Sequence, residues 1–138
     1  MEARDLVMED IHIGDSSSFD RLWTEEDVNT FAKLSGDMNP LHMEDGYAQT
    51  TQFGERLVHG MLVASLCSTF VGMYIPGKRC LYLSQTLSFK KPVFIGDTVT
   101  VTGVVIAKSV ATKILSLAIS IRKGEEEVVE GEARVQVL

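Results

Sequence analysis

Residues 57–72 read LVHGMLVASLCSTFVG, and after His59 this stretch contains no charged side chain. A helix that is apolar on nearly every side is typical of a buried position rather than of a protein surface. The apolar run from Gly60 to Ile75 is shorter than the ~18 residues expected of a membrane span. The stretch therefore predicts a helix in the core of the protein and argues against a membrane-spanning segment.

Strands are predicted on the C-terminal side of this helix. Alternation places one set of side chains on a single face of the first strand, namely Leu81, Leu83, Gln85, Leu87 and Phe89. Pro92 and Gly96-Asp97 interrupt this pattern. Further strands follow at residues 98–105, 114–121 and 128–137, with a hairpin turn at residues 123–125. A meander of four strands is expected.

The N-terminal part predicts a short strand at residues 19–23 and then a helix. Thr24 can cap the first turn, and the acidic residues 25–27 favour the positive end of the helix dipole. Gly36 is a plausible end for this helix. Its buried side is expected to contain Val28, Phe31, Ala32 and Leu34.

These elements predict an α+β fold, in one domain over residues 1–138, with a mostly antiparallel sheet curved around one buried helix. A single open sheet leaves unpaired strand edges. Pairing between two copies of the chain would remove one of these edges, so we expect a homodimer.

Composition narrows the class of protein. The 138 residues fit one domain of common size, and the hydrophobic content of 45% suffices for one core. The net charge of −6 argues against nucleic acid as the main partner, because nucleic-acid binding leaves a basic footprint. Cys67 and Cys80 have no metal-ligand spacing and no signal peptide is visible. We therefore expect reduced core thiols, a cytoplasmic protein and no metal site.

A second stretch, residues 31–42, reads FAKLSGDMNPLH and holds a carboxylate and an imidazole five residues apart, Asp37 and His42. Pro40 lacks an N–H and disfavours the α conformation of Asn39. We therefore expect Asp37, Asn39 and His42 on a tight polar loop between two helical segments. Loops braced by rigid elements are where catalytic groups are most often found.

This stretch resembles the signature of the MaoC-like, (R)-specific enoyl-CoA hydratases. The pattern Tyr/Phe-x-x-Leu-Ser-Gly-Asp-x-Asn-Pro-Leu-His runs from Phe31 and is followed by Ala48. The agreement covers about residues 12–137 and continues through Phe53-Gly54, His59-Gly60-Met61, Pro76-Gly77, Tyr82-Leu83, residues 89–93 and Gly96-Asp97. The resemblance implies a hot-dog fold, a homodimer, and reversible syn hydration of a trans-2-enoyl thioester to the (R)-3-hydroxyacyl thioester. It implies no cofactor beyond the CoA or acyl carrier protein (ACP) that carries the acyl group.

Hydration of an enoyl thioester requires a base for the attacking water, a proton for C2, and stabilisation of the charge that develops on the thioester oxygen. Asp37 and His42 can supply the first two through one bound water, and the resemblance makes Asp37 the base. Asn39 would fix the loop or the substrate. The resemblance places the oxyanion donor at the backbone N–H of Gly60, at a helix N-terminus where free N–H groups point outward.

Other residues are weaker candidates. Ser68 and Val71 would lie near the acyl pocket, although a serine within a helix often bonds the preceding turn and Val71 fits a core position. The CoA phosphates need cations, for which Lys90, Lys91, Lys78 and Arg79 are candidates. Alone, Asp37 would be interpreted as a turn residue and His42 as a core histidine, but their combination with Asn39-Pro40 and His59-Gly60 favours catalysis. His59 itself is expected to be structural.

Three alternatives stay open. A hot-dog thioesterase would direct water at C1 instead of C3, but thioesterases of this fold generally lack the Asp-x-Asn-Pro-x-His loop. A non-catalytic acyl-CoA binding module would need neither Asp37 nor His42. The chain could also be one piece of a larger fused enzyme. The sequence specifies neither the acyl chain length nor the choice between CoA and ACP.

Overall fold

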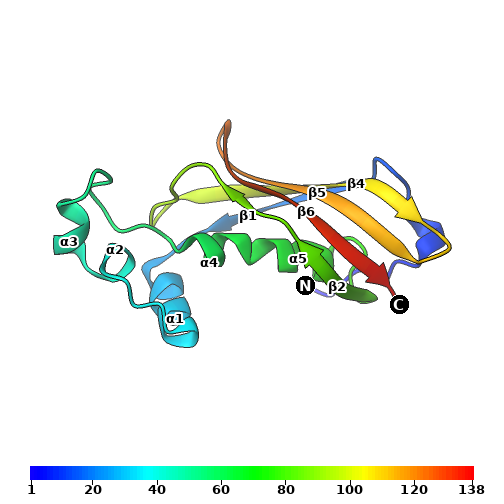
Figure 1. The fold of residues 1–138 in the computed structure, drawn as a ribbon, viewed down its shortest axis with the longest axis horizontal. Helices are drawn as coiled ribbons and strands as arrows, with labels where there is room; N and C mark the ends of the chain where they lie inside the picture. The colour runs from blue at the N-terminus through cyan, green and yellow to red at the C-terminus, as the bar shows by residue number, and fades with distance from the viewer.

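The computed structural model describes residues 1–138 and is built on one antiparallel sheet (Figure 1). The strand order is β1-β4-β5-β6-β2, and the short β3 also pairs with β6. The strands are β1 (Ser16–Leu22), β2 (Cys80–Gln85), β3 (Ser88–Phe89), β4 (Thr98–Ser109), β5 (Ile114–Lys123) and β6 (Glu126–Val137). This is the predicted hot-dog arrangement, in which a curved sheet wraps around a helix.

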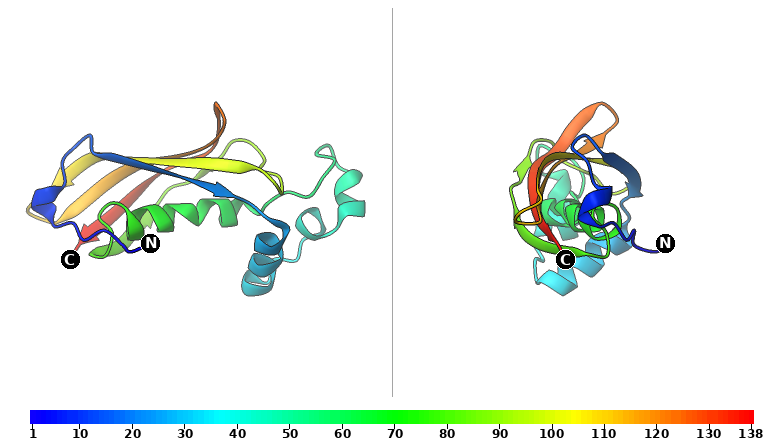
Figure 2. Two further views of the ribbon diagram at one scale, coloured as in Figure 1. Left: turned by 180° about the vertical axis from the view of Figure 1, so that it is seen from behind. Right: turned by 90° about the vertical axis from the view of Figure 1, so that its right-hand side faces the viewer.

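The helices divide into two groups. The central pair, α4 (Gly60–Ala64) and α5 (Leu66–Met73), lies along the concave face of the sheet, and the end-on view of Figure 2 shows the sheet curving round it. The other group lies at the end of the sheet where α4 begins, and comprises α1 (Glu25–Ser35), α2 (Pro40–Met43) and α3 (Asp45–Gln49). A 3₁₀ turn, η1 (Met8–Asp10), precedes β1. None of these helices is long and apolar enough to cross a membrane.

The prediction of a four-stranded meander is wrong in one respect. Strands β4, β5 and β6 form the meander, but β2 pairs with β6 and β1 covers the other edge of β4. The chain leaves the edge of β6 near Pro92, whose missing N–H cannot continue a ladder, and re-enters the sheet as β4.

The prediction that alternate residues from 81 to 89 share one face of a single strand is also wrong. A register shift between Tyr82 and Ser84 and the break between β2 and β3 leave Leu87 packed against the core. Leu81, Leu83 and Phe89 are instead about half exposed, at 46%, 46% and 52%.

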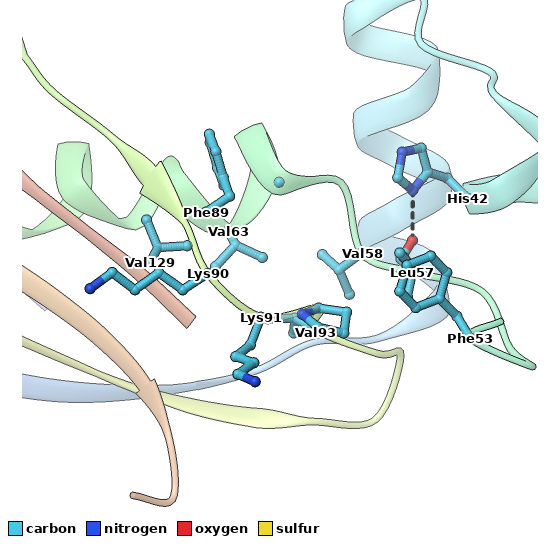
Figure 3. Close-up of a pocket in the computed structure, with 12 residues that line it drawn as sticks. His42, Phe53, Leu57, Val58, Val63, Phe89, Lys90, Lys91, Val93 and Val129 are labelled. Carbon is cyan, nitrogen blue, oxygen red and sulfur yellow. Dashed lines mark hydrogen bonds between the residues drawn. The ribbon is translucent and has the colours of Figure 1, made fainter. Parts of the chain in front are cut away.

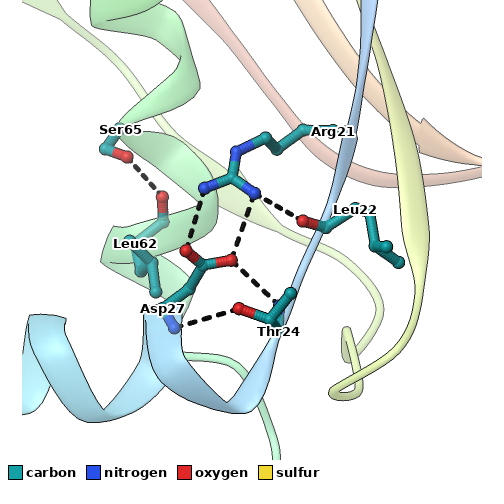
Figure 4. A network of polar contacts seen from close by, with 6 residues as sticks. All are labelled: Arg21, Leu22, Thr24, Asp27, Leu62 and Ser65. Atoms are coloured by element: carbon teal, nitrogen blue, oxygen red, sulfur yellow. Dashed lines mark hydrogen bonds and ion pairs between the residues drawn. The ribbon is translucent and has the colours of Figure 1, made fainter.

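The predicted limits of α1 are confirmed. Thr24 caps the helix, because its Oγ1 accepts the Asp27 N–H at 3.2 Å while the Asp27 carboxylate accepts the Thr24 N–H at 2.9 Å. Arg21 from β1 donates twice to the same carboxylate, at 3.0 and 3.1 Å (Figure 4). Burial opposes the charged form, but the hydrogen bonds from Arg21 and Thr24 lower the pKa of Asp27 below its ordinary value. Gly36, in the left-handed conformation at φ 83°, ends the helix.

One part of the predicted buried side of α1 is wrong. Val28 and Ala32 are buried, but Leu34 is 83% exposed. Leu34 lies six residues after Val28, which is about 240° around a helix of 3.6 residues per turn. It therefore lies away from the face of α1 that carries Val28 and Ala32.

The central helix is buried on the side that faces the sheet and exposed along the other side. Phe70 and Val71 are buried, whereas Met61 is 59% exposed and Ser65 and Thr69 are also exposed. The prediction of burial on all sides is therefore wrong for a single chain, since one sheet can cover only one side of a helix.

Phe70 lies so close to the sheet that a side chain directly beneath it is excluded. A Cβ added at Gly103 in β4 would lie 2.3 Å from the Phe70 ring. Around this contact the inward-facing positions of β4 and β5 complete the core, with Val99, Val101, Val105, Leu115, Leu117, Ile119 and Ile121.

We predict that Gly103→Ala lowers the free energy of unfolding by roughly 1–3 kcal/mol, because the added methyl group overpacks the Phe70 contact. Urea denaturation measures the change. Combining Gly103→Ala with Phe70→Leu should recover part of the loss. Gly46→Ala is the matched control, since no atom lies within 4 Å of a Cβ at Gly46. A Gly103→Ala protein as stable as the wild type would contradict this account of the packing.

Candidate active site

The segment between α1 and α2 carries two of the predicted site residues. The Asn39 side chain caps α2 by accepting the Leu41 N–H at 2.9 Å, and the Asn39 N–H donates to Asp37 Oδ1 at 3.2 Å. Pro40 occupies the first position of α2, where a missing N–H costs no helical hydrogen bond. The prediction that His42 lies on a loop is therefore wrong, because Asn39-Pro40 starts a short helix that carries His42.

The His42 ring has a defined orientation. Its Nδ1 lies 2.8 Å from the carbonyl oxygen of Leu57 (Figure 3). A carbonyl only accepts, so Nδ1 carries the proton of the neutral ring and Nε2 presents a lone pair. His42 can therefore accept a proton at Nε2 and return it.

Asp37 and His42 come close together, as predicted. Ligating atoms of Asp37, His42 and His59 all lie within 4.8 Å of one another. A separation of this size suits one water bridging a carboxylate and an imidazole. Asp37 is exposed, so solvent reaches the pair.

His59 lies beneath this pair and is only 2% exposed. Its Nε2 donates to the backbone carbonyl of Asp37 at 3.0 Å, and its ring stacks on His42 with centroids 4.0 Å apart. The edge of Phe31 completes its surroundings at 4.9 Å. Burial lowers the pKa of His59, and the nearby His42 and Arg56 lower it further against the opposing effect of Asp37. His59 is therefore a neutral ring in contact with both predicted catalytic residues.

Arg56 is a buried charge that no sequence pattern marked. It is 6% exposed, and its Nε donates to the carbonyl of His42 at 2.6 Å. Its other nitrogens donate to Glu25 and Asn29 of α1, each at 2.9 Å. Arg56 thereby fixes α2, which carries His42, against α1.

A pocket of about 380 Å³ opens beside His42 and the start of α4 (Figure 3). Its walls are mostly apolar and consist of Phe53, Leu57, Val58, Val63, Phe89, Pro92, Val93 and Val129. His42, Gly60, Lys90 and Lys91 complete the lining. The pocket can therefore hold an apolar chain, with an imidazole and a helix N-terminus at its wall.

Gly60 lies at the first position of α4, where its N–H has no acceptor within the helix. A Cβ at this position would lie 3.1 Å from the Phe89 ring, so glycine avoids crowding this wall of the pocket. The structure thus places the predicted oxyanion donor in the same pocket as His42.

The two predicted acyl-binding residues of α5 lie outside the pocket. Ser68 is exposed on the outer side of α5 and Val71 is buried in the core, and neither lines the pocket. Their part in acyl binding stays a prediction.

Only one of the four candidate phosphate-binding cations lies in the pocket without a carboxylate partner. Lys90 pairs with Glu130 at 2.9 Å and with Glu127 at 3.1 Å, and these bonds raise its pKa. Lys78 and Arg79 pair with Asp5 and do not line the pocket. Lys91 therefore remains as the free cation at the wall.

Asp37, His42 and His59 are also the one set of side chains close enough to hold a metal ion. In each histidine one ring nitrogen already faces a backbone carbonyl. These hydrogen bonds account for the orientation of both rings.

Comparison with known proteins gives consistent matches over most of the chain. Residues 11–128 match the family described as MaoC like domain. The (R)-specific enoyl-CoA hydratase of Rhodospirillum rubrum is 42% identical over 99% of this chain and 97% of its own length. The 3-hydroxybutyryl-CoA dehydratase of Methylorubrum extorquens is 38% identical over 99% of this chain and 87% of its own. The solved structure of the (R)-hydratase from Aeromonas caviae, involved in PHA biosynthesis, superposes with a TM-score of 0.90 at 41% identity, over 93% of this chain and 98% of that one.

The buried His59 predicts a pH dependence of stability. Its pKa in the folded protein lies below the ordinary 6.5, so the unfolded chain binds this proton more readily. The free energy of unfolding should therefore fall as the pH drops below about 6.5, by at most about 1.4 kcal/mol per pH unit for this one proton. Asp27 and Glu127, whose pKa values are lowered, stay ionised down to about pH 5.5 and add nothing in that range.

Urea denaturation between about pH 8 and 5.5 measures this slope. His59→Asn should flatten it, whereas the same substitution at the exposed His12 should leave it as in the wild type. An unchanged slope in His59→Asn would show that His59 is not the group whose burial disfavours the proton.

Proposed function

This chain belongs to the MaoC-like domain family, and on that premise we propose that it catalyses the reversible syn hydration of trans-2-enoyl-CoA to (R)-3-hydroxyacyl-CoA. The observation that carries the proposal is the placement of a carboxylate and an imidazole within 4.8 Å of each other, with the imidazole lining an apolar pocket beside a helix N-terminus. The relatives named as hydratase and dehydratase act in the two directions of one reaction, which supports a lyase.

The proposed step begins with a water held by Asp37 and His42. Both groups accept hydrogen bonds in their starting states, so the two hydrogens of the water are engaged and an oxygen lone pair is free to attack C3. The C3–O bond forms as one O–H bond breaks, and the proton passes to Asp37, with His42 sharing the transfer. A proton from the same pair then reaches C2, so hydrogen and hydroxyl add to one face.

Negative charge develops on the thioester oxygen during the attack. The Gly60 N–H at the start of α4 would stabilise it, helped by the positive end of the helix dipole. No group leaves and the C–S bond stays intact, which distinguishes this reaction from thioester hydrolysis.

The rest of the site supports an acyl thioester as substrate. The apolar pocket would receive the acyl chain, and Lys91 would meet a phosphate of the carrier. Asn39 would act through the loop, since its side chain caps α2. We propose CoA as the carrier on the basis of the named relatives, with ACP as the alternative to be compared in the same assay.

We further propose a cytoplasmic enzyme without a cofactor. Cys67 and Cys80 are free, and burial raises the pKa of each thiol to about 11. Such thiols are protonated and unreactive, which supports a structural role for both.

We also propose a homodimer that forms at the β2 edge of the sheet. β2 pairs with β6 on one side only. The half-exposed Leu81 and Leu83 lie on this edge strand, and Phe89 follows in β3. A second copy would satisfy the free backbone groups of β2 and cover these apolar side chains.

The dimer is tested by light scattering in dilute buffer, which should give about twice the mass of one chain. Leu81→Glu combined with Leu83→Glu should shift the protein towards the monomer by placing charges at the proposed interface. The control is Val110→Glu, which charges an equally apolar but exposed residue in the turn after β4. A wild-type protein that is monomeric and fully active would overturn the proposal.

The reaction itself is tested with crotonyl-CoA, by following the loss of the conjugated absorbance and, in parallel, the release of thiol. Asp37→Asn and His42→Gln should each lower kcat by roughly 10²–10⁴, because neither amide can carry the proton. The double variant should fall little below the worse single variant, since both residues act on one water.

Asp45→Asn and His12→Gln are matched controls at exposed positions and should retain the wild-type rate. Thiol release that equals substrate loss would contradict the hydratase proposal and show that the protein is a thioesterase. Binding of crotonyl-CoA without turnover in the wild type would favour a non-catalytic acyl-CoA module.

A further inference from the structure

We propose that His59 is the positioning residue of this site, which fixes Asp37, His42 and Gly60 relative to one another. The inference rests on the proposed hydratase function and assigns a task to a histidine that the sequence alone marks as structural. Three contacts, one to each group, carry it.

The first contact holds Asp37. The other hydrogen bonds of this residue are local, from its N–H to Ser35 Oγ at 3.1 Å and from the Asn39 N–H to its carboxylate at 3.2 Å. The bond from His59 Nε2 to the Asp37 carbonyl, at 3.0 Å, spans 22 residues and ties the exposed segment to the start of α4. Without it, the carboxylate would lie on a segment anchored only to its own neighbours.

The second contact holds the His42 ring. The hydrogen bond from Nδ1 to Leu57 restrains one ring atom but still allows the ring to tilt about its Cβ–Cγ bond. The His59 ring, 4.0 Å away and inclined by 25°, lies against the face of His42 and blocks this rotation. Together, the bond and the stack fix the direction in which His42 Nε2 points.

The third contact is covalent. His59 directly precedes Gly60, and its carbonyl accepts the N–H groups of Leu62 at 3.0 Å and Val63 at 3.1 Å in the first turn of α4. The backbone of His59 therefore starts the helix that presents the Gly60 N–H, while its side chain reaches Asp37 and His42. One residue links the proposed base, its partner and the oxyanion donor.

The environment of His59 selects one form of the ring. A carbonyl faces Nε2, so the proton must be there, and the buried Nδ1 has no hydrogen-bond partner. A second proton would place a charge beside His42 and Arg56 without an acceptor at Nδ1, with only the Asp37 side chain nearby to compensate. His59 thus stays neutral and acts by its shape and its single donor.

The test separates the donor from the ring. His59→Phe keeps an aromatic ring for the stack but loses the hydrogen bond to Asp37. His59→Gln keeps an N–H donor close to the position of Nε2 but loses the stack. Each should lower kcat for crotonyl-CoA by about 10- to 100-fold, the scale of a misplacement near 1 Å, and leave KM within about twofold, because no pocket wall changes. The exposed His12→Phe is the matched control and should keep wild-type kinetics.

A residue that acts through Asp37 also gives a non-additive double variant. Once Asp37→Asn has removed the base, adding His59→Phe should cost less than threefold, whereas a general loss of structure would multiply the two losses. Circular dichroism and thermal melting establish that each variant is folded. Imidazole ¹⁵N chemical shifts of the wild-type protein provide a test without a variant: they should show His59 neutral with the proton on Nε2.

Folded His59 variants with kcat within twofold of the wild type, multiplying losses, or a proton on Nδ1 would overturn the proposal. Its failure is distinguishable from that of the proposed function. If Asp37→Asn lowers kcat and the His59 variants do not, only the positioning role fails. If Asp37→Asn itself leaves turnover unchanged, the acid–base site is wrong.

Discussion

The contact between the central helix and the sheet is the constraint on which the other elements depend. Phe70 of α5 lies against Gly103 of β4 at a distance that leaves no room for a Cβ on the strand. This close approach fixes the height of α4 and α5 above the sheet. It thereby sets the place where α4 begins, at the end of the sheet where α1, α2 and α3 gather (Figure 1). The start of this helix is the part of the core that the pocket reaches, so core packing determines where the free N–H of Gly60 lies.

The site is then assembled on that helix start by a few polar contacts that cross between elements. Arg56 ties the α2 carbonyl of His42 to α1, Leu57 holds the His42 ring, and His59 reaches the carbonyl of Asp37. Each contact uses a backbone carbonyl as acceptor, so the positions of the catalytic side chains follow from the course of the main chain. Burial of Arg56 and His59 excludes water from these contacts, and this makes their loss more costly than the loss of an exposed hydrogen bond.

Much of the fold and of the site can be predicted from the sequence, and the predictions that are wrong fail for physical reasons. Capping chemistry located Thr24 and Gly36 correctly, and strand-favouring residues bounded by turns located the long strands, because both signals are local. Strand order is not local, so the pairing of β2 with β6 could not be predicted from the spacing of the strands. The expectation of a loop at His42 overlooks that a proline at the first position can start a helix, as Pro40 starts α2. His59 and Arg56 look ordinary in the sequence, because their importance comes from partners 14 to 31 residues away.

The central claim is that a water held by Asp37 and His42 adds to C3 of an enoyl thioester while the thioester survives. Isotope labelling tests it most directly. The protein is incubated with crotonyl-CoA in ¹⁸O-labelled water, and the products are analysed by mass spectrometry. The account predicts one labelled oxygen in an intact 3-hydroxybutyryl-CoA, on the (R)-hydroxyl group, and no labelled free acid. Label in the carboxylate of a released acid, with free CoA in equal amount, would contradict it.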